Sequence, residues 1–280
     1  MISSLHLLYG RGDGPPTDSW RELRPERLDP VGVQAYLDEF PVPRRSCFEG
    51  VWTAWEPPRP GHDGRPPADL LARAVDSAAA GRVALALSGG LDSALLLSFL
   101  ERRLPVYTLD IPGYEELDRT ARIARRFGVR LEVVRVTHAD FEDALPDAVL
   151  HAGAPLYNFH IVSKLLFARA LRREGFEAAI TGDGADQVFA GARGDLYLPF
   201  VGAFFRSAGV EIRAPYLDDD VVAAAETDPA KSALRALARG RLPDALIDAP
   251  KRPTLYPGQD KEAVKRLTLS ILRSLLEEVP

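Results

Sequence analysis

The feature that most constrains the fold is an alternation of short apolar runs with longer amphipathic segments between residues 83 and 181. Continuous apolar runs of this length are typical of strands buried on both faces of a sheet. Strands separated by helices pair in parallel. The order therefore predicts an α/β protein with a parallel sheet sandwiched by helices. Strands are expected over 83–87, 106–109, 131–136 and 178–181, and helices over 68–80, 92–103, 115–127, 139–151 and 158–174.

The two ends of the chain differ from this pattern. Beyond Gly182 no further strand is expected, and 218–225, 230–238 and 261–278 are expected to be helices. Residues 1–65 hold all three tryptophans and many prolines, with one short strand expected at 51–55. A Pro- and Gly-rich linker follows, to about residue 67. We therefore expect a short N-terminal segment over 1–65 and a main domain over 68–280, whose C-terminal helical part is reduced.

Composition excludes several classes of function. A formal net charge of −5 gives no whole-chain support for nucleic-acid binding. The single cysteine, Cys47, excludes an intramolecular disulfide and a thiolate zinc cluster. His138, His151 and His160 lack metal-ligand spacing, and each is expected to be a surface or packing residue. With no secretory leader and no membrane-length apolar run, we expect a cytoplasmic protein with neither a nucleic-acid nor a membrane partner.

The segment Ser88-Gly89-Gly90-Leu91-Asp92-Ser93 lies between a predicted buried strand and a predicted helix. Its glycines let backbone N–H groups approach an anion, and the helix N-terminus favours phosphate charge. Asp92 would repel a phosphate unless a cation lay between them, which predicts Mg²⁺. The alternative is a tight turn in which Asp92 only assists the helix N-terminus. The segment is not a Walker A loop, because the lysine and the longer glycine spacing are missing.

This loop and three later motifs resemble, in the same order, the asparagine synthetase branch of the PP-loop ATP pyrophosphatases. Residues 181–191 resemble that family's Ser-Gly-Glu-Gly-Ser-Asp-Glu segment, and residues 213–218 resemble its Arg-x-Pro-Phe-Leu-Asp. Residues 249–252 fall where the family has an Arg-x-Lys element. The resemblance spans about residues 68–260. It implies the PP-loop ATP pyrophosphatase fold, ATP and Mg²⁺ as ligands, and relatives that include β-lactam synthetase and lasso-peptide macrolactam cyclases.

The resemblance also implies roles for particular residues. Asp92 and Asp186 would hold Mg²⁺, because each follows a strand at the same sheet edge; the alternative is that Asp186 only caps a short helix. Thr181 and Gly182 would lie near the adenosine, and Leu109 would contact the adenine. The implied nucleotide contacts are Ser88, Gly89, Gly90, Leu91, Asp92, Ser93, Leu109, Thr181 and Gly182.

Three residues are candidates for the chemistry. Lys251, one of only five lysines, would neutralise the departing pyrophosphate, or else be a surface cation. Asp183 replaces the family's glutamate and would position the attacking amine or take its proton, or else be a turn residue. Tyr157 would act as a base, as in the β-lactam-forming branch, or else pack.

One departure from the family concerns glutamine. Residue 2 is Ile2 rather than the family's nucleophilic cysteine, and 1–65 is too short for a glutaminase domain. We expect this segment to be a remnant or replacement of that domain, so that the chain does not hydrolyse glutamine itself. Nitrogen would come from free ammonia, from an amine, or from a partner protein that supplies nitrogen or substrate. The chain could also form a homodimer.

The expected function is an ATP-dependent synthetase that adenylates a small-molecule or peptide carboxylate and transfers it to ammonia or an amine, in specialised or natural-product metabolism. Two alternatives stay open. One is another PP-loop adenylating enzyme that modifies a nucleobase or tRNA. The other is a nucleotide-binding subunit that completes or regulates a partner enzyme.

Overall fold

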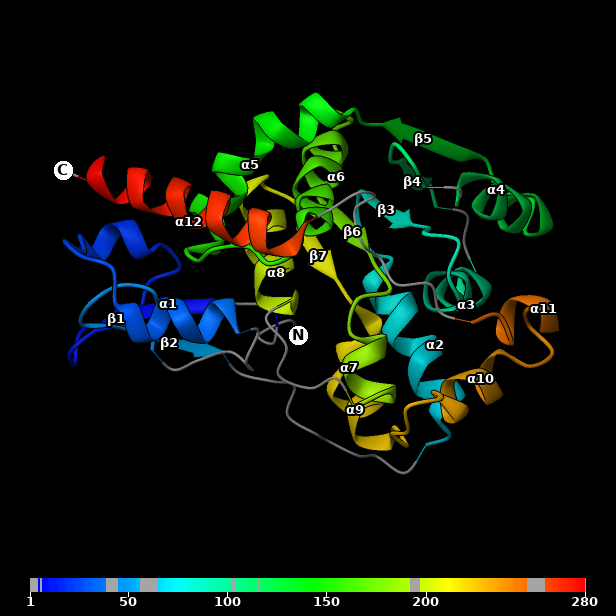
Figure 1. Cartoon of the computed structure of the whole chain (residues 1–280). Helices are drawn as coiled ribbons and strands as arrows, with labels where there is room; N and C mark the ends of the chain where they lie inside the picture. The colour runs from blue at the N-terminus through cyan, green and yellow to red at the C-terminus, as the bar shows by residue number, and fades with distance from the viewer. Residues whose placement is uncertain are drawn as a thin grey trace.

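A five-stranded parallel sheet forms the centre of the computed structural model, with strand order β5-β4-β3-β6-β7 (Figure 1). The four expected strands are present, and all neighbouring pairs are parallel, so the predicted fold class is confirmed. These strands are β3 (Val83–Ala86), β4 (Val106–Asp110), β5 (Leu131–Arg135) and β6 (Ala178–Ile180). The structure describes residues 5, 7–38, 45–55, 65–101, 104–114, 116–191, 197–250 and 260–279.

The expectation that no strand follows Gly182 is wrong. β7 (Glu211–Arg213) lies beside β6, with Arg213 opposite Ile180. Ile212 is the only fully buried residue of this three-residue strand, so its sequence carries no periodic signal. Its pairing depends on contacts that form only in the folded chain.

Helices cover both faces of the sheet (Figure 1). On one face, α2 (Pro67–Ala78) contacts α3 (Leu91–Phe99), and α4 (Leu117–Arg126) packs against β4. On the other face, α5 (His138–Ala152), α6 (Val162–Arg173) and α8 (Tyr197–Ser207) contact one another. The helix expected over 158–174 begins as a 3₁₀ turn, η3 (Phe159–Ile161), and α8 was not expected. The remaining C-terminal elements are α7 (Ala185–Phe189), η4 (Pro215–Leu217), α9 (Asp219–Ala224), α10 (Ser232–Ala238), α11 (Asp244–Ile247) and α12 (Lys261–Glu277).

The N-terminal segment shares a hydrophobic core with α5, α6, α8 and α12. It contains an antiparallel pair, β1 (Leu7–Arg11) and the expected β2 (Val51–Trp55), with η2 (Trp20–Leu23) and α1 (Pro30–Leu37). The Tyr9 hydroxyl donates to the Ala152 carbonyl at 2.8 Å, and Trp20 Nε1 donates to the Leu150 carbonyl at 2.8 Å. The segment is therefore attached to the end of α5, while most of the expected linker lies outside the described residues.

Close packing of the N-terminal segment on α8 yields a stability prediction. A Cβ added at Gly202 would lie 1.7 Å from the Leu5 carbonyl oxygen, so no side chain fits there. Gly202→Ala is expected to lower the free energy of unfolding by about 1–3 kcal/mol, because the segment must move away from α8. Urea unfolding would measure this loss. An unchanged midpoint would show that the segment is not held against α8.

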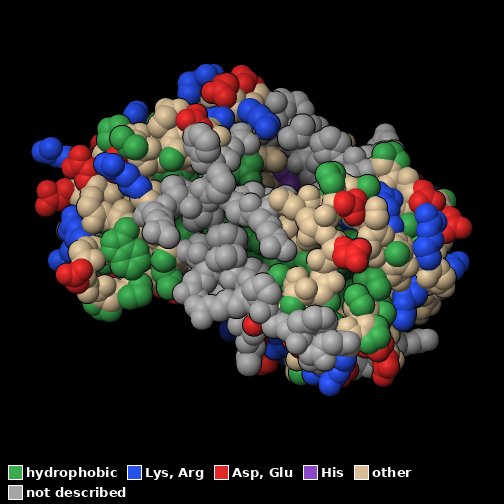
Figure 2. Space-filling model, turned by 90° about the horizontal axis from the view of Figure 1, so that it is seen from below, with side chains coloured by type: hydrophobic (Ala, Val, Ile, Leu, Met, Phe, Trp, Pro, Cys, Tyr) green, Lys and Arg blue, Asp and Glu red, His purple; other side chains and the backbone are tan. Residues whose placement is uncertain are grey.

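Charged side chains of both signs are interspersed around the edge of one face of the molecule (Figure 2). Among the side chains coloured by type on that face, positive and negative ones alternate without one large patch of either sign, which agrees with the modest net charge of −5. Among the helices that the structure describes, none has the length and apolar character needed to cross a membrane.

Candidate active site

The carboxyl ends of β3, β4 and β6 open into a cavity of about 790 Å³. This edge is where ligands bind in open parallel sheets. The cavity walls come from the loops after these strands, from η3 and α6, and from the chain around α10. The cavity is lined by eleven of the predicted site residues: Ser88, Gly90, Leu91, Asp92, Ser93, Leu109, Tyr157, Thr181, Gly182, Asp183 and Asp186. Gly89 does not line it, and Lys251 lies outside the described part of the chain.

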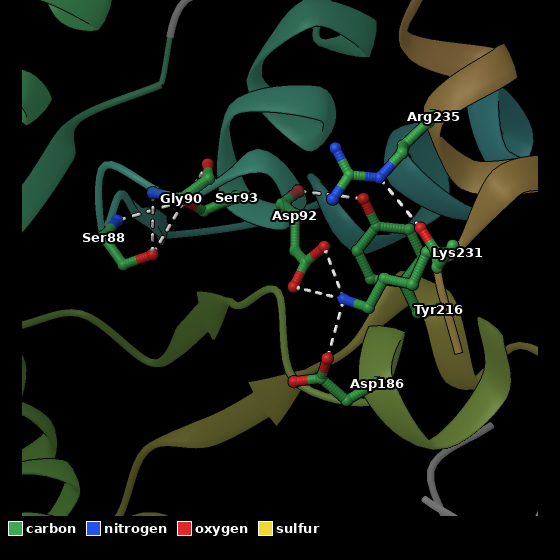
Figure 3. Close-up of polar contacts among 9 residues, drawn as sticks. Ser88, Gly90, Asp92, Ser93, Asp186, Tyr216, Lys231 and Arg235 are labelled. Atoms are coloured by element: carbon green, nitrogen blue, oxygen red, sulfur yellow. Dashed lines mark hydrogen bonds and ion pairs between the residues drawn. The ribbon is translucent and has the colours of Figure 1, made fainter. Parts of the chain in front are cut away.

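The loop after β3 is held by its own serines (Figure 3). The Ser88 amide donates to Ser93 Oγ at 3.0 Å, and the two hydroxyl oxygens lie 3.1 Å apart. α3 begins at Leu91 without a side-chain cap at Gly90. The N-terminus of this helix therefore faces the cavity and favours an anion there. Gly89 packs against α4: its carbonyl accepts a hydrogen bond from Arg119, and a Cβ there would lie 2.5 Å from Thr120 Oγ1.

The loop after β6 packs directly on the first loop. A Cβ added at Gly182 would lie 3.1 Å from the Ser93 amide nitrogen and 3.3 Å from Asp92 Cβ, so the close approach requires glycine. The chain then turns through Gly184 into α7, whose first turn carries Asp186. Two segments about ninety residues apart thus form one continuous surface of the cavity.

Lys231 joins the two loops (Figure 3). Its Nζ lies 2.9 Å from both carboxylate oxygens of Asp92 and 2.8 Å from Asp186 Oδ1. Its side chain is 10% exposed, and its backbone has the left-handed conformation, with φ of 54°. Non-glycine residues adopt this conformation rarely, and the surrounding contacts must hold it. The sequence prediction gave Lys231 no role; the scarcity of lysines was its only signal.

The motif at 213–218 supports the site from behind. The Tyr216 hydroxyl donates to the Asp92 carbonyl at 2.8 Å, and burial raises the pKa of this phenol well above its ordinary value, so it stays protonated. Arg213 donates to the Ala78 carbonyl at 2.9 Å and so ties β7 to the end of α2. Tyr216 thus fixes the start of α3, Arg213 fixes β7, and neither residue lines the cavity.

The two predicted metal ligands lie within reach of one ion, because both contact the same lysine nitrogen. Within the described ranges no group of three His, Cys, Asp or Glu residues could hold a metal. A divalent cation between Asp92 and Asp186 would therefore need further oxygen ligands from a phosphate or water, and the Lys231 ammonium would have to move. The Mg²⁺ site stays a prediction.

Thr181 lines the cavity, and its hydroxyl oxygen is buried. The residue is 1% exposed, and its Oγ1 has no hydrogen-bond partner among the residues that the structure describes. A buried hydroxyl without a partner costs free energy, so native proteins rarely keep one without a reason. A polar group of a ligand would satisfy it only after the surrounding atoms moved, because this oxygen has almost no accessible surface.

The wall opposite the Ser88–Ser93 loop holds a second ion pair. Lys164 Nζ lies 3.0 Å from Asp183 Oδ1 and 2.9 Å from Oδ2. One turn earlier, His160 Nδ1 lies 3.0 Å from the Tyr114 hydroxyl. Burial, helped by the Lys164 ammonium, lowers the pKa of His160 to about 4, so its ring is neutral at physiological pH. His160, expected to be a surface or packing residue, is one of the residues that line the cavity.

Comparison with known proteins identifies the family. The family model for asparagine synthase matches residues 68–205 and 204–278, a region that contains the sheet and both loops. The chain belongs to the asparagine synthase family. The cavity thus lies within the matched region, and the resemblance to the asparagine synthetase family predicted over 68–260 is confirmed.

Individual relatives match over shorter regions. The chain is 30% identical over 130 residues to the protein "Amidase chyE" of Penicillium rubens. This alignment covers 39% of this chain and 19% of that protein. It is 32% identical over 111 residues to a putative glutamine-hydrolysing asparagine synthetase of Mycobacterium tuberculosis, covering 38% of this chain and 17% of that one. The match thus spans less than a fifth of either relative. A solved NMN synthetase from Francisella tularensis aligns over 76% of this chain and 94% of its own, with 15% identity and a TM-score of 0.42.

Proposed function

We propose that this asparagine synthase family member is an ATP-dependent synthetase that activates a carboxylate as an acyl-adenylate and transfers the acyl group to ammonia or an amine. The observation that carries the proposal is the convergence of the Ser88–Ser93 loop and the Thr181–Asp186 loop on one cavity. One loop offers a helix N-terminus and hydroxyls, and the other offers an unsatisfied hydroxyl and a carboxylate. These groups suit a nucleotide with a charged pyrophosphate and a polar sugar.

The proposed reaction has two steps. A carboxylate oxygen of the acid attacks the α-phosphorus of ATP, and the bond to the pyrophosphate oxygen breaks. The amine then attacks the acyl carbon of the mixed anhydride, AMP leaves, and the amine gives up a proton. Lys231 is placed to neutralise phosphate oxygens when it leaves Asp92 and Asp186, and such charge compensation strengthens as the pyrophosphate departs.

Asp92 and Asp186 are the residues that would hold Mg²⁺, together with phosphate oxygens. Two carboxylates and several non-protein oxygens suit this ion, which is usually bound by one or two carboxylates plus substrate phosphates. When bound, it would neutralise phosphate charge and fix the geometry of the pyrophosphate. In the proposed enzyme the Lys231 ammonium balances the same carboxylates before the metal–nucleotide complex arrives.

Thr181 gives a prediction with two opposite effects. Thr181→Val keeps the shape and removes the unpartnered hydroxyl, so the free energy of unfolding is expected to stay equal or rise by about 1 kcal/mol. ATP affinity is expected to fall about tenfold, because the nucleotide loses a hydrogen bond in a buried site. Thermal unfolding with and without ATP would measure both. Lower stability of the variant without ATP, with unchanged ATP affinity, would contradict this role.

The function is tested by pyrophosphate release from ATP across a panel of carboxylic acids, with ammonium or hydroxylamine as acceptor. Hydroxylamine converts an acyl-adenylate into a hydroxamate, which identifies the activated acid. Pyrophosphate and AMP in equal amounts, dependent on the acid, are the expected products. ADP as the product would overturn the adenylation mechanism. Tight ATP binding without turnover on any acid would favour the nucleotide-binding subunit instead.

A further inference from the structure

We propose that Lys164 and His160 form a subsite that binds a carboxylate group of the acid substrate, with Asp183 as the residue that positions Lys164. This inference rests on the proposed function and assigns residues to the acid. It concerns the cavity wall made by η3 and α6, which faces the two nucleotide loops. Lys164 is a residue for which the sequence prediction gave no role.

The geometry fixes Lys164 as a cation that faces the cavity. Its ammonium contacts both oxygens of Asp183, at 2.9 and 3.0 Å, and lies 5.7 Å from the ring centroid of Tyr197. The Asp183 side chain is 7% exposed, whereas that of Lys164 is 22% exposed. The Lys164 side chain is therefore more accessible than the side chain of its counterion.

Hydrogen-bond capacity indicates what such a ligand offers. An ammonium has three donors, and within the described part of the chain Lys164 uses its hydrogen bonds on Asp183 alone. The remaining N–H needs an acceptor. His160 adds a second donor when Nδ1 accepts from the Tyr114 hydroxyl, because the neutral ring then carries its proton on Nε2. Two donors and a positive charge match a carboxylate.

The same arrangement disfavours a cationic ligand at this point. An ammonium ion would be repelled by Lys164, and the negative charge of Asp183 is already balanced by the Lys164 ammonium. The sequence prediction offered Asp183 as a group that binds or deprotonates the amine. In this structure Asp183 instead keeps Lys164 extended toward the cavity, and the amine must approach from another side.

Acetate is the probe for this subsite, in the full-length protein without ATP. The ring signals of nitrogen-labelled histidine are followed by NMR while sodium acetate is added against sodium chloride at equal ionic strength. His160→Gln assigns the signal. The His160 resonance is expected to shift and saturate with acetate and not with chloride. Lys164→Met is expected to weaken acetate binding about tenfold or more, because a charge-assisted hydrogen bond is lost.

Two further variants serve as controls for this test. Lys164→Arg keeps a cation and is expected to retain acetate binding, and Lys261→Met removes an exposed lysine of α12 and is expected to change nothing. Should Lys164→Met fail to fold, the wild-type comparison of acetate with chloride decides. Equal shifts with both salts, or unchanged acetate affinity in folded Lys164→Met, would overturn the subsite. Acetate binding without pyrophosphate release from any acid would instead remove the proposed function and leave the subsite standing.

Discussion

Asp92→Asn is expected to reduce pyrophosphate release by about two to three orders of magnitude, comparable to the loss of one preorganised electrostatic group in an active site. Asp92 lies at the start of α3, where its carboxylate shares Lys231 with Asp186. The amide keeps the shape but removes the negative charge. Among the described residues, Lys231 then keeps an ion pair with Asp186 only, and the proposed metal loses one of its two charged protein ligands.

The matched control is Asp118→Asn, which removes an exposed carboxylate from the first turn of α4. This residue does not line the cavity, so release is expected to stay at the wild-type rate. Both proteins should show the same far-UV circular dichroism. Full activity in Asp92→Asn would mean that the Ser88–Ser93 loop does not hold the reacting part of ATP.

Lys231→Met is expected to lower turnover about as much as Asp92→Asn does. Unlike Asp92→Asn, it is expected to strengthen the binding of a divalent cation. Pyrophosphate release should fall by about two to three orders of magnitude, because a cation no longer meets the phosphates. Without ligands, Asp92 and Asp186 then lack the Lys231 ammonium that pairs with both, which should lower the free energy of unfolding by about 1–3 kcal/mol.

A divalent cation should relieve that repulsion. Mn²⁺ alone is expected to raise the melting temperature of Lys231→Met by several degrees, since a ligand that binds only the native state stabilises it. The wild-type protein should show a much smaller shift, because the Lys231 ammonium competes for the same carboxylates. Lys261→Met serves as the control for loss of a lysine. An equal Mn²⁺ effect in the wild type and Lys231→Met would show that the ammonium and the metal do not share a place.

The parts that the sequence predicted are those with strong local signals. β3 and β6 are continuous apolar runs buried on both faces, and Gly89-Gly90 comes three residues after the first of them ends. Such a pattern depends on a few consecutive residues. Since parallel strands end at one edge of a sheet, it also placed Asp92 and Asp186 on the same side.

The missed parts depend on contacts between distant segments. β7 is too short to show a period, and it becomes a strand only because β6 offers an open edge. Lys231 lies 139 residues after Asp92 and contacts it only in the folded chain. Its left-handed backbone conformation could not be predicted from the sequence. The pairing of Lys164 with Asp183 likewise joins α6 to the loop after β6. Each of these residues has ordinary neighbours in the sequence, and only the fold gives it a role.

The most direct test of the central claim follows oxygen from the acid into AMP. The acid that releases the most pyrophosphate is labelled with oxygen-18 in its carboxyl group and incubated with ATP, acceptor and enzyme, and the AMP is examined by phosphorus NMR. Because the carboxylate oxygen attacks the α-phosphorus and the amine then breaks the acyl–oxygen bond, the account predicts AMP that carries one labelled oxygen. Unlabelled AMP, or ADP as the product, would contradict it.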